Sequence, residues 1–350
     1  MQRLIDELHG RFAPLDEGEP ALYIPQLACV DPDLFGISVV TADGRRFDAG
    51  DAGHGFTLQS VSKPLVYGLA LEACGDERLG RRVGVEPTGE PFNGIVRLDA
   101  TGRPFNAMVN TGAIAVTDLI RAGVGGEGGA GGGLAERKAL VEERIGRFLG
   151  RRPAVDDAVL RSERETGDRN RAIAYLLRDF GRLDGPVDES LELYFHQCSL
   201  TVTAADLAVA GATLAAGGVN PVTGEAALPP EHVPAVLSLM LSCGMYDRSG
   251  AWAYEVGLPA KSGVGGGITA VAPGRMGIGV FSPRIDAQGN SLRGMRVIEE
   301  ISRRLGLHLL AVGPPAAAPA ADDPDAPAAA GARRLHGEPA PPPPAAVHPR

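Results

Sequence analysis

The stretch Gln59-Ser60-Val61-Ser62-Lys63-Pro64-Leu65 leads into a mostly apolar run that ends at Ala73, and this segment decides the fold. Such a run, with almost no turn-forming residue, predicts a buried helix. Proline is tolerated in the first turn of a helix and breaks a helix further in, so Pro64 places Ser60 at or just before the N-terminus. If this turn is helical, Lys63 faces the same side as Ser60.

Ser60 and Lys63 have the chemistry of a nucleophile and its base. A serine hydroxyl attacks at neutral pH only with an adjacent base, and burial can lower the pKa of a lysine enough for that role. The spacing S-x-x-K resembles the nucleophile motif of serine β-lactamases and penicillin-binding proteins. The alternative is a serine that caps the helix beside a solvated lysine. Four residues do not decide between these readings, so the other motifs must.

The composition excludes several classes of function. The chain has 350 residues, 44% of them apolar, which is enough for a large core. A net charge of −9 and the lack of a long basic run argue against a nucleic-acid partner. We find no apolar run long enough to span a bilayer and no signal peptide, so no membrane role is expected.

The cysteines and histidines indicate neither a disulfide framework nor a metal site. The four cysteines are far apart and form no C-x-x-C pair, which favours free thiols in a reducing cytoplasm. The seven histidines show no metal-binding spacing. We therefore expect a cytoplasmic protein without a bound metal.

Periodicity and turn residues predict an antiparallel sheet built from both ends of the chain. Asp43-Gly44 is typical of a hairpin between strands at 35–41 and 45–49, and Pro273-Gly274 of a turn between strands at 268–272 and 276–281. Residues 76–110 are expected to be irregular, and the glycine-dominated segment 123–133 to be a flexible surface connection. Helices are expected in 1–19 and over 65–73, 113–121, 134–149, 169–180, 203–216, 229–243 and 294–305.

Five further clusters combine polar, aromatic or glycine residues in ways that suggest a site, although each has an ordinary structural explanation. They could be turn asparagines, a charged loop at a helix start, core aromatics, a helix stop and a flexible turn before a strand. In that order they are Pro104–Ile114, Ser162–Asn170, Leu193–Ser199, Cys243–Asp247 and Leu258–Ile268. Within the last, Lys261-Ser262-Gly263 resembles the K-T-G strand motif of the β-lactamase group.

Together and in this order, the motifs resemble those of the serine-dependent glutaminases, over residues from about 15 to 310. The segments that carry the resemblance are YIPQLA, QSVSKPL, NAMVNTGAI, SERETGDRN, LYFHQCS, LAAGGVNPVTG, CGMYD and GLPAKSGVGGG. Lys63-Pro64-Leu65 and the 162–170 block are closer to the animal-type branch of that family. The resemblance implies a β-lactamase/DD-peptidase-like fold of the α/β (α+β) class, an antiparallel sheet flanked by helices with a helical subdomain.

This resemblance implies a domain organisation. Residues 1–312 are expected to form the glutaminase catalytic domain, with the sheet part drawn from roughly 20–60 and 255–312 and the helical subdomain from roughly 75–250. Residues 313–350 are rich in alanine and proline, cannot bury a core, and are expected to be a disordered tail.

The resemblance also implies a role for each site residue. Ser60 is expected to be the acyl nucleophile, Lys63 its base and Tyr246 a proton shuttle near the leaving ammonia. Val264 is expected to donate its backbone N–H to the oxyanion, beside that of Ser60. The substrate-binding residues implied are Tyr23, Ser60, Asn110, Glu163, Asn170, Tyr194, Tyr246 and Val264.

The residue types suit this substrate independently of the resemblance. The α-ammonium of glutamine needs a carboxylate such as Glu163, and its α-carboxylate needs neutral donors such as asparagine and tyrosine side chains. Glycines around Val264 let the backbone approach a substrate closely. Thr111 departs from the family pattern, which usually has alanine there, and adds a hydroxyl next to Asn110.

We therefore expect a cytoplasmic homo-oligomer, a dimer or tetramer, that hydrolyses L-glutamine and needs no cofactor. Two alternatives stay open. One is a β-lactamase-like amidase or peptidase with another substrate, against which Glu163 argues because an acylated amine has no ammonium to pair with it. The other is a non-catalytic amino-acid-binding sensor, against which the presence of both Ser60 and Lys63 argues.

Overall fold

The computed structural model of the chain describes residues 1–88, 98–123 and 133–311. Residues Met1–Ala311 form one compact unit. The expected tail and nearly all of the expected glycine-rich connection lie outside the described residues. No helix in the described ranges is long and apolar enough to cross a membrane.

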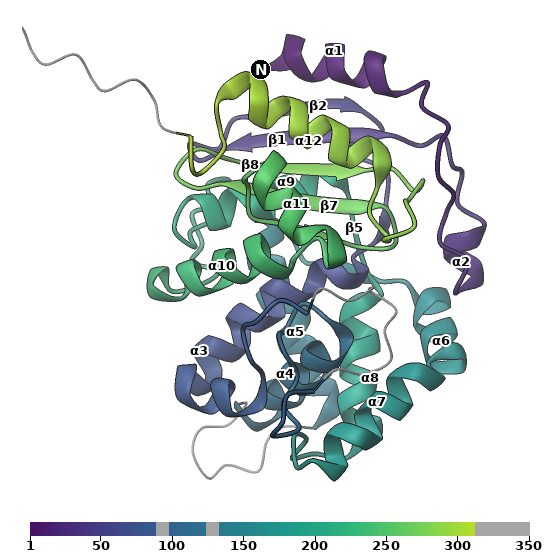
Figure 1. Cartoon of the computed structure of the whole chain (residues 1–350), viewed down its shortest axis with the longest axis vertical. Coiled ribbons are helices and arrows are strands. Elements are labelled where there is room, and N and C mark those ends of the chain that lie inside the picture. The colour runs from purple at the N-terminus through teal and green to yellow at the C-terminus, as the bar shows by residue number, and fades with distance from the viewer. Residues whose placement is uncertain (89–97, 124–132, 312–350) are drawn as a thin grey trace, which may run out of the picture. The chain divides into compact units, whose positions relative to one another are not determined.

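A five-stranded antiparallel sheet joins the two ends of this unit, as predicted (Figure 1). The hairpin strands β1 and β2 pair in register, and β1 also pairs with β8, with Gly36 opposite Phe281. The strands follow in the order β2 (Arg46–Gly50), β1 (Gly36–Thr41), β8 (Met276–Phe281), β7 (Gly267–Ala272) and β6 (Ala260–Ser262). Segments more than 200 residues apart in the sequence are thus hydrogen-bonded neighbours.

The two faces of the sheet carry different side chains because successive strand residues point to opposite sides. On β8, Ile278 and Val280 belong to a core shared with α1 (Gln2–Phe12) and α12 (Leu292–Leu305). The alternate residues of this strand, Gly277 and Gly279, face the opposite side.

Helix α9 (Ala204–Ala215) packs on that second face, and glycine lets it lie unusually close. A Cβ on Gly277 would lie 2.1 Å from the backbone nitrogen of Ala212, and one on Gly279 would lie 2.0 Å from the carbonyl oxygen of Ala204. Thr203 caps this helix in a reciprocal capping box with Asp206. The sheet is therefore buried on both faces, with α9 filling the space that side chains would otherwise occupy.

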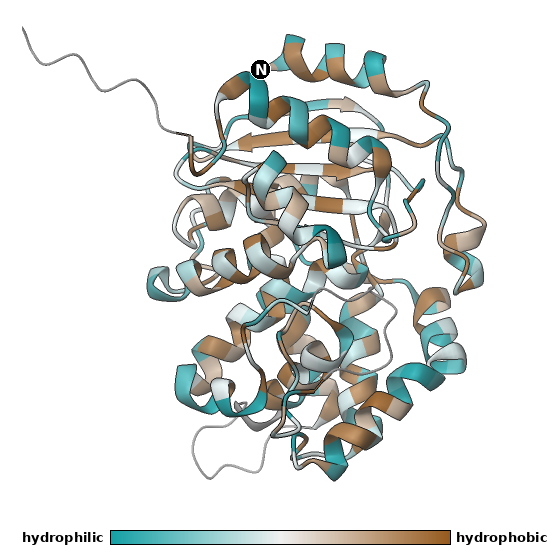
Figure 2. Ribbon diagram, in the orientation of Figure 1, coloured by the Kyte–Doolittle hydropathy of each residue, from teal (hydrophilic) through white to brown (hydrophobic). Residues whose placement is uncertain are grey.

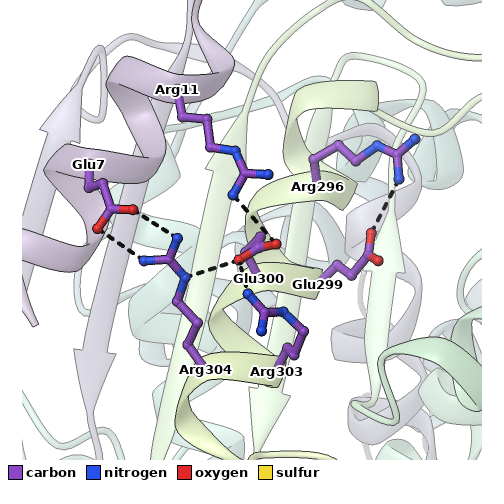
Figure 3. Close-up of polar contacts among 7 residues, drawn as sticks. All are labelled: Glu7, Arg11, Arg296, Glu299, Glu300, Arg303 and Arg304. Atoms are coloured by element: carbon purple, nitrogen blue, oxygen red, sulfur yellow. Dashed lines mark hydrogen bonds and ion pairs between the residues drawn. The ribbon is translucent and has the colours of Figure 1, made fainter.

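Helices α1 and α12 cover the first face and contact each other through charged side chains (Figure 3). Arg304 donates to both carboxylate oxygens of Glu7, at 2.8 and 3.0 Å, and Arg11 lies 3.6 Å from Glu300. Figure 2 shows hydrophilic and hydrophobic residues alternating along both helices, as expected for helices with one buried and one exposed face. Exposed ion pairs contribute little each, so the apolar face provides most of the stability.

Of the remaining helices, the two that follow residue 232 lie beside the sheet and most of the others form a helical part of the unit (Figure 1), which confirms the predicted α/β class with an antiparallel sheet flanked by helices. A second, three-stranded sheet, which we did not predict, has the strand order β3 (Phe56–Thr57), β5 (Leu200–Val202) and β4 (Ala154–Val155).

The helices of the described residues other than α1, α9 and α12 are α2 (Pro25–Ala28), α3 (Ser62–Arg82), α4 (Asn110–Gly123), α5 (Leu134–Leu149), α6 (Asp157–Thr166), α7 (Asp168–Asp179), α8 (Val187–Cys198), α10 (Val233–Cys243) and α11 (Ser249–Glu255). Short 3₁₀ turns are η1 (Gln59–Val61), η2 (Pro230–His232) and η3 (Tyr246–Arg248).

One expectation about local structure was wrong, one ordinary structural alternative is excluded, and helix α8 was not predicted. Helix α3 does not stop near residue 73 but bends at Gly75, whose φ is 72°, and continues to Arg82, so residues 76–82 are not irregular. The charged block 162–170 is not a loop at a helix start: it ends α6 and begins α7, with Gly167 between them. The aromatic cluster at 193–199 lies on a helix, α8, that we did not predict.

Candidate active site

Ser60 lies in the 3₁₀ turn η1, directly before α3, where the position of Pro64 predicted it. The preceding residue, Gln59, has φ of 48°, which is unusual for a residue with a side chain. The Nζ of Lys63 donates to the Oγ of Ser60 at 2.9 Å. The strained turn therefore directs the serine hydroxyl toward the lysine.

Lys63 has the environment of a base that is available near neutral pH. Its side chain is buried, and burial lowers its pKa to about 8. The Nζ also donates to Oδ1 of Asn110 at 2.7 Å, and Nδ2 of Asn110 donates to Oδ1 of Asn170 at 3.1 Å. When Lys63 is neutral, a hydrogen bond to Asn110 leaves its lone pair free to point at Ser60.

Tyr246 lies far from Ser60 in the sequence but contacts it in the folded chain. It lies in η3 with φ of 56°, and its hydroxyl donates to the carbonyl of Ser262 at 3.1 Å. Burial raises the pKa of Tyr246, and a hydrogen bond with Ser60 opposes part of that rise. The Nζ of Lys261, which is fully buried, lies 4.2 Å from the centre of the Tyr246 ring. The phenol therefore stays protonated and contacts both Ser60 and a second buried amine.

Val264 lies in the tight turn between β6 and β7, against η1. A Cβ on Gly263 would lie 3.1 Å from the side chain of Val61, and one on Gly265 would lie 3.6 Å from that of Gln59. Among the described residues, the backbone N–H groups of Ser60 and Val264 donate no hydrogen bond. They are thus available to an oxygen atom held above Ser60.

Glu163 forms the other side of the site. Only 6% of its surface is exposed, and burial raises its pKa to about 7, although a hydrogen bond from Gln59 and the charge of Lys63 oppose that rise. The Tyr23 hydroxyl donates to Oε1 of Gln59 at 2.9 Å. Tyr194 is buried beside Glu163, whose charge helps burial to raise the tyrosine pKa. A buried carboxylate in these surroundings is suited to pair with a cation.

All nine candidate residues lie in or beside this one site, on segments that are far apart in the sequence. Sequence reasoning missed Gln59, which joins Tyr23 to Glu163, and Cys198, whose thiol contacts Tyr194 and carries a pKa raised to about 12 by burial. A glutamine directly before the nucleophile was the available signal for the first. Thr111, the departure from the family pattern, is buried in α4 next to Asn110.

A serine next to a buried lysine, at a helix start beside an antiparallel sheet, is typical of serine hydrolases with the β-lactamase-like fold. Comparison with known proteins narrows this class. The sequence model of the family described as Glutaminase matches residues 18–310. A protein named glutaminase from Trichormus variabilis is 52% identical over 306 residues, which cover 87% of this chain and 89% of that protein.

Solved structures agree with the sequence comparison. A probable glutaminase, ybaS, has a TM-score of 0.82 at 42% identity, with 87% of this chain and 96% of that chain covered. A structure of Mglu in its glutamate form has a TM-score of 0.83 at 42% identity, with 90% and 71% covered. The chain therefore belongs to the glutaminase family and is an amidohydrolase of that family.

Proposed function

We propose that this chain hydrolyses L-glutamine to L-glutamate and ammonia through an acyl-enzyme on Ser60, with Lys63 as the base. The observation that carries this proposal is the 2.9 Å contact between Ser60 Oγ and Lys63 Nζ at a helix start, opposite a buried carboxylate. The Ser60–Lys63 pair can attack an amide carbon. Glu163 can pair with an α-ammonium group, which favours a free amino acid as the substrate.

The first half of the reaction acylates Ser60. Neutral Lys63 takes the proton of Ser60 as Oγ bonds to the side-chain amide carbon of glutamine. The N–H groups of Ser60 and Val264 donate to the oxyanion that forms. Tyr246, which contacts Ser60, passes a proton to the nitrogen as the carbon–nitrogen bond breaks and ammonia leaves. Water then attacks the ester by the same steps in reverse, which releases glutamate.

The second part of the proposal concerns the α-amino and α-carboxylate groups. Glu163 would pair with the α-ammonium, and Tyr23, Asn170 and Tyr194 offer neutral donors to the α-carboxylate. The related Mglu has been crystallised in a glutamate form, which supports a site of this kind in the family.

The test is ammonia release by the wild-type chain from glutamine and from asparagine, together with hydrolysis of a β-lactam, which is followed by the absorbance change on ring opening because no ammonia leaves. Asparagine is one methylene shorter, so its amide should not reach Ser60 when its ammonium is paired with Glu163, and we expect release from glutamine to be far faster. Hydrolysis of the β-lactam in preference to glutamine would favour the alternative amidase. Binding of glutamine without release of ammonia would favour the non-catalytic sensor.

The nucleophile is tested with Ser60→Ala, using Ser242→Ala as the matched control because that hydroxyl donates to a carbonyl within α10. We expect Ser60→Ala to lose turnover while its circular dichroism spectrum stays that of the wild type. The control should keep full activity. More than a trace of activity in folded Ser60→Ala would exclude Ser60 as the nucleophile.

We also propose that the chain works in the cytoplasm as a homo-oligomer, a dimer or tetramer, and has no nucleic-acid partner. All four cysteines are free thiols, and the net charge of −9 disfavours a polyanion. Light scattering on the purified chain should give a mass of two or four copies, and a monomer would contradict this part.

A further inference from the structure

One carboxylate joins three helices on the side of α8 that faces away from Ser60. Oε2 of Glu192, in α8, accepts a hydrogen bond from Nε of Arg164 at 2.7 Å. Nη2 of the same guanidinium donates to Oε1 of Glu192. Lys138 of α5 donates to that carboxylate at 2.5 Å. Glu192 therefore ties α8 to α6 and to α5 at the same point, and Figure 1 shows α8 between the other two helices.

These contacts lie directly behind the pocket for the amino acid. Arg164 follows Glu163 in α6, and Glu192 lies two residues before Tyr194 in α8. Residues two apart on a helix point to nearly opposite sides, so Tyr194 faces the site while Glu192 faces away. The polar contact on the outer side thus fixes the separation of Glu163 and Tyr194 on the inner side.

Helix α6 is attached at Glu163 itself, through the hydrogen bond from Gln59, and at its start. There the Asp156 side chain caps the helix, and its N–H donates to the carbonyl of Ser199 at 2.8 Å. Glu163 lies seven residues further on, which is about 10 Å along a helix. A tilt of about 5° about the start would move the carboxylate by about 1 Å, enough to spoil a charge-assisted hydrogen bond.

The second end of α6 is also close to α8, which limits the tilt to one direction. A Cβ on Gly167 would lie 2.6 Å from the ring of Phe195, so α6 cannot move closer to α8 at that point. The Arg164–Glu192 contact opposes movement away from α8 at this end, and the apolar packing of Val159 against Leu27 of α2 holds the start of α6. The guanidinium is 43% exposed and the carboxylate 18%, so the pair adds little to global stability.

The charges are in the state that this contact requires. Burial would raise the pKa of Glu192, but the hydrogen bonds from Arg164 and Lys138 bring it below its usual value. The carboxylate is therefore ionised throughout the neutral range. Two cations share one anion, so both donors can stay engaged at once.

We propose that Glu192 is a positioning residue for substrate binding: through its paired contact with Arg164 it holds Glu163 at the distance from Tyr194 that the α-ammonium and α-carboxylate of one amino acid require. This inference rests on the proposed glutaminase function. Glu192 does not contact the substrate in this proposal, but it determines how tightly the site binds it.

Steady-state kinetics with glutamine, together with calorimetric titration of glutamate, test this role. Glu192→Gln keeps the size and one acceptor but removes the charge that holds both cations. We expect KM and the glutamate Kd to rise about five- to tenfold while kcat stays within about twofold, because Ser60 and Lys63 are untouched. The melting temperature should fall by no more than about 2 °C.

Three further variants separate positioning from a general loss of structure. Glu143→Gln is the matched control, since Glu143 pairs with Arg147 on the exposed side of α5 and not with α8; it should leave KM unchanged. Lys138→Met removes the tie to α5 but leaves the Arg164 contact, so it should raise KM less than Glu192→Gln. Arg164→Lys keeps the charge without the paired geometry and should raise KM nearly as much.

The outcomes are distinguishable from failure of the proposed function. If the wild type releases no ammonia from glutamine, the function is wrong, whatever the variants do. If the wild type is active, a KM within twofold of it in Glu192→Gln, a fall in kcat at unchanged KM, or an equal rise in Glu143→Gln would overturn the positioning role. Should Glu192→Gln fail to fold, Arg164→Lys provides the same test.

Discussion

Replacing Glu163 by glutamine tests most specifically how the site distinguishes a free amino acid from other amides. Glu163→Gln keeps the length of the side chain and one acceptor oxygen but removes its negative charge. The side chain is buried at 6% exposure beside Gln59 and Tyr194, so the substitution removes a charge that solvent does not screen.

The magnitude follows from two opposing effects. Removing one partner of a buried, hydrogen-bonded charge pair costs about 2–5 kcal/mol, much of it because the other charge is left unpaired. Burial has already raised the pKa of Glu163 to about 7, so the ionised carboxylate is itself unfavourable in the free protein, and the substitution removes that cost. We therefore expect the lower part of the range, about 2–3 kcal/mol, or about 30- to 150-fold in kcat/KM.

The assay compares glutamine with N-acetylglutamine, which has the same side-chain amide and no ammonium. The wild type should prefer glutamine, and Glu163→Gln should reduce that preference by at least about tenfold, with the loss for glutamine mainly in KM. Glu165→Gln is the matched control because Glu165 is exposed in the same helix. It should leave both substrates unaffected.

An unchanged ratio of the two kcat/KM values in Glu163→Gln would refute the reasoning. It would mean that Glu163 does not read the amino group, and the assignment of a free amino acid as substrate would lose its main physical support. A large loss of kcat at constant KM would instead place Glu163 in the chemical steps.

Three other predictions follow from the geometry. The kcat/KM for glutamine should rise with pH through about 7, because Glu163 must lose its proton to bind an ammonium, and through about 8, because Lys63 must be neutral to accept the proton of Ser60. A flat profile from about pH 6 to 9 would contradict both assignments. Gly279→Ala places a Cβ 2.0 Å from a backbone oxygen of α9, so unfolding should need about 3 kcal/mol less. Gly10→Ala lies in helix α1 with nothing within 4 Å and should melt no lower than the wild type. Equal melting temperatures of the two variants would be inconsistent with the close packing. Removal of residues 313–350 should leave kcat/KM within about twofold, since the family match ends at residue 310, and a larger loss would show that the tail contributes to activity.

Local signals predicted the sheet and the position of Ser60 at the start of α3 well. Asp43-Gly44 allows only a tight hairpin, and Pro64 cannot lie beyond the first turn of α3, so both constraints act within a few residues. The order of the motifs then indicated the family, which the comparisons confirmed.

The errors arose where distant contacts decide the structure. Gly75 looks like the end of a helix, but the chain resumes a helix after one residue with φ of 72°, and Leu79 is buried in the core. The charged residues before Gly167 look like a loop, yet Asp156 caps them into α6 and Arg164 pairs across to α8.

The site shows the same limit. Residue types indicated which side chains could bind an amino acid, but not that Gln59 lies between Tyr23 and Glu163, because this depends on a strained φ of 48° and on strands that pair across the molecule. The depressed pKa of Lys63 likewise depends on burial by segments far away in the sequence.

The central claim is a covalent glutamyl ester on Ser60, and mass spectrometry of acid-quenched enzyme tests it most directly. The wild-type chain is mixed with glutamine, quenched during turnover and digested, and the peptide that contains Ser60 is compared with the same peptide from Ser60→Ala. The account predicts that the wild-type peptide gains the mass of glutamine minus ammonia, on Ser60, and that the variant shows neither the adduct nor ammonia release. A glutamyl group on a different residue, or ammonia release by Ser60→Ala at the wild-type rate, would contradict it.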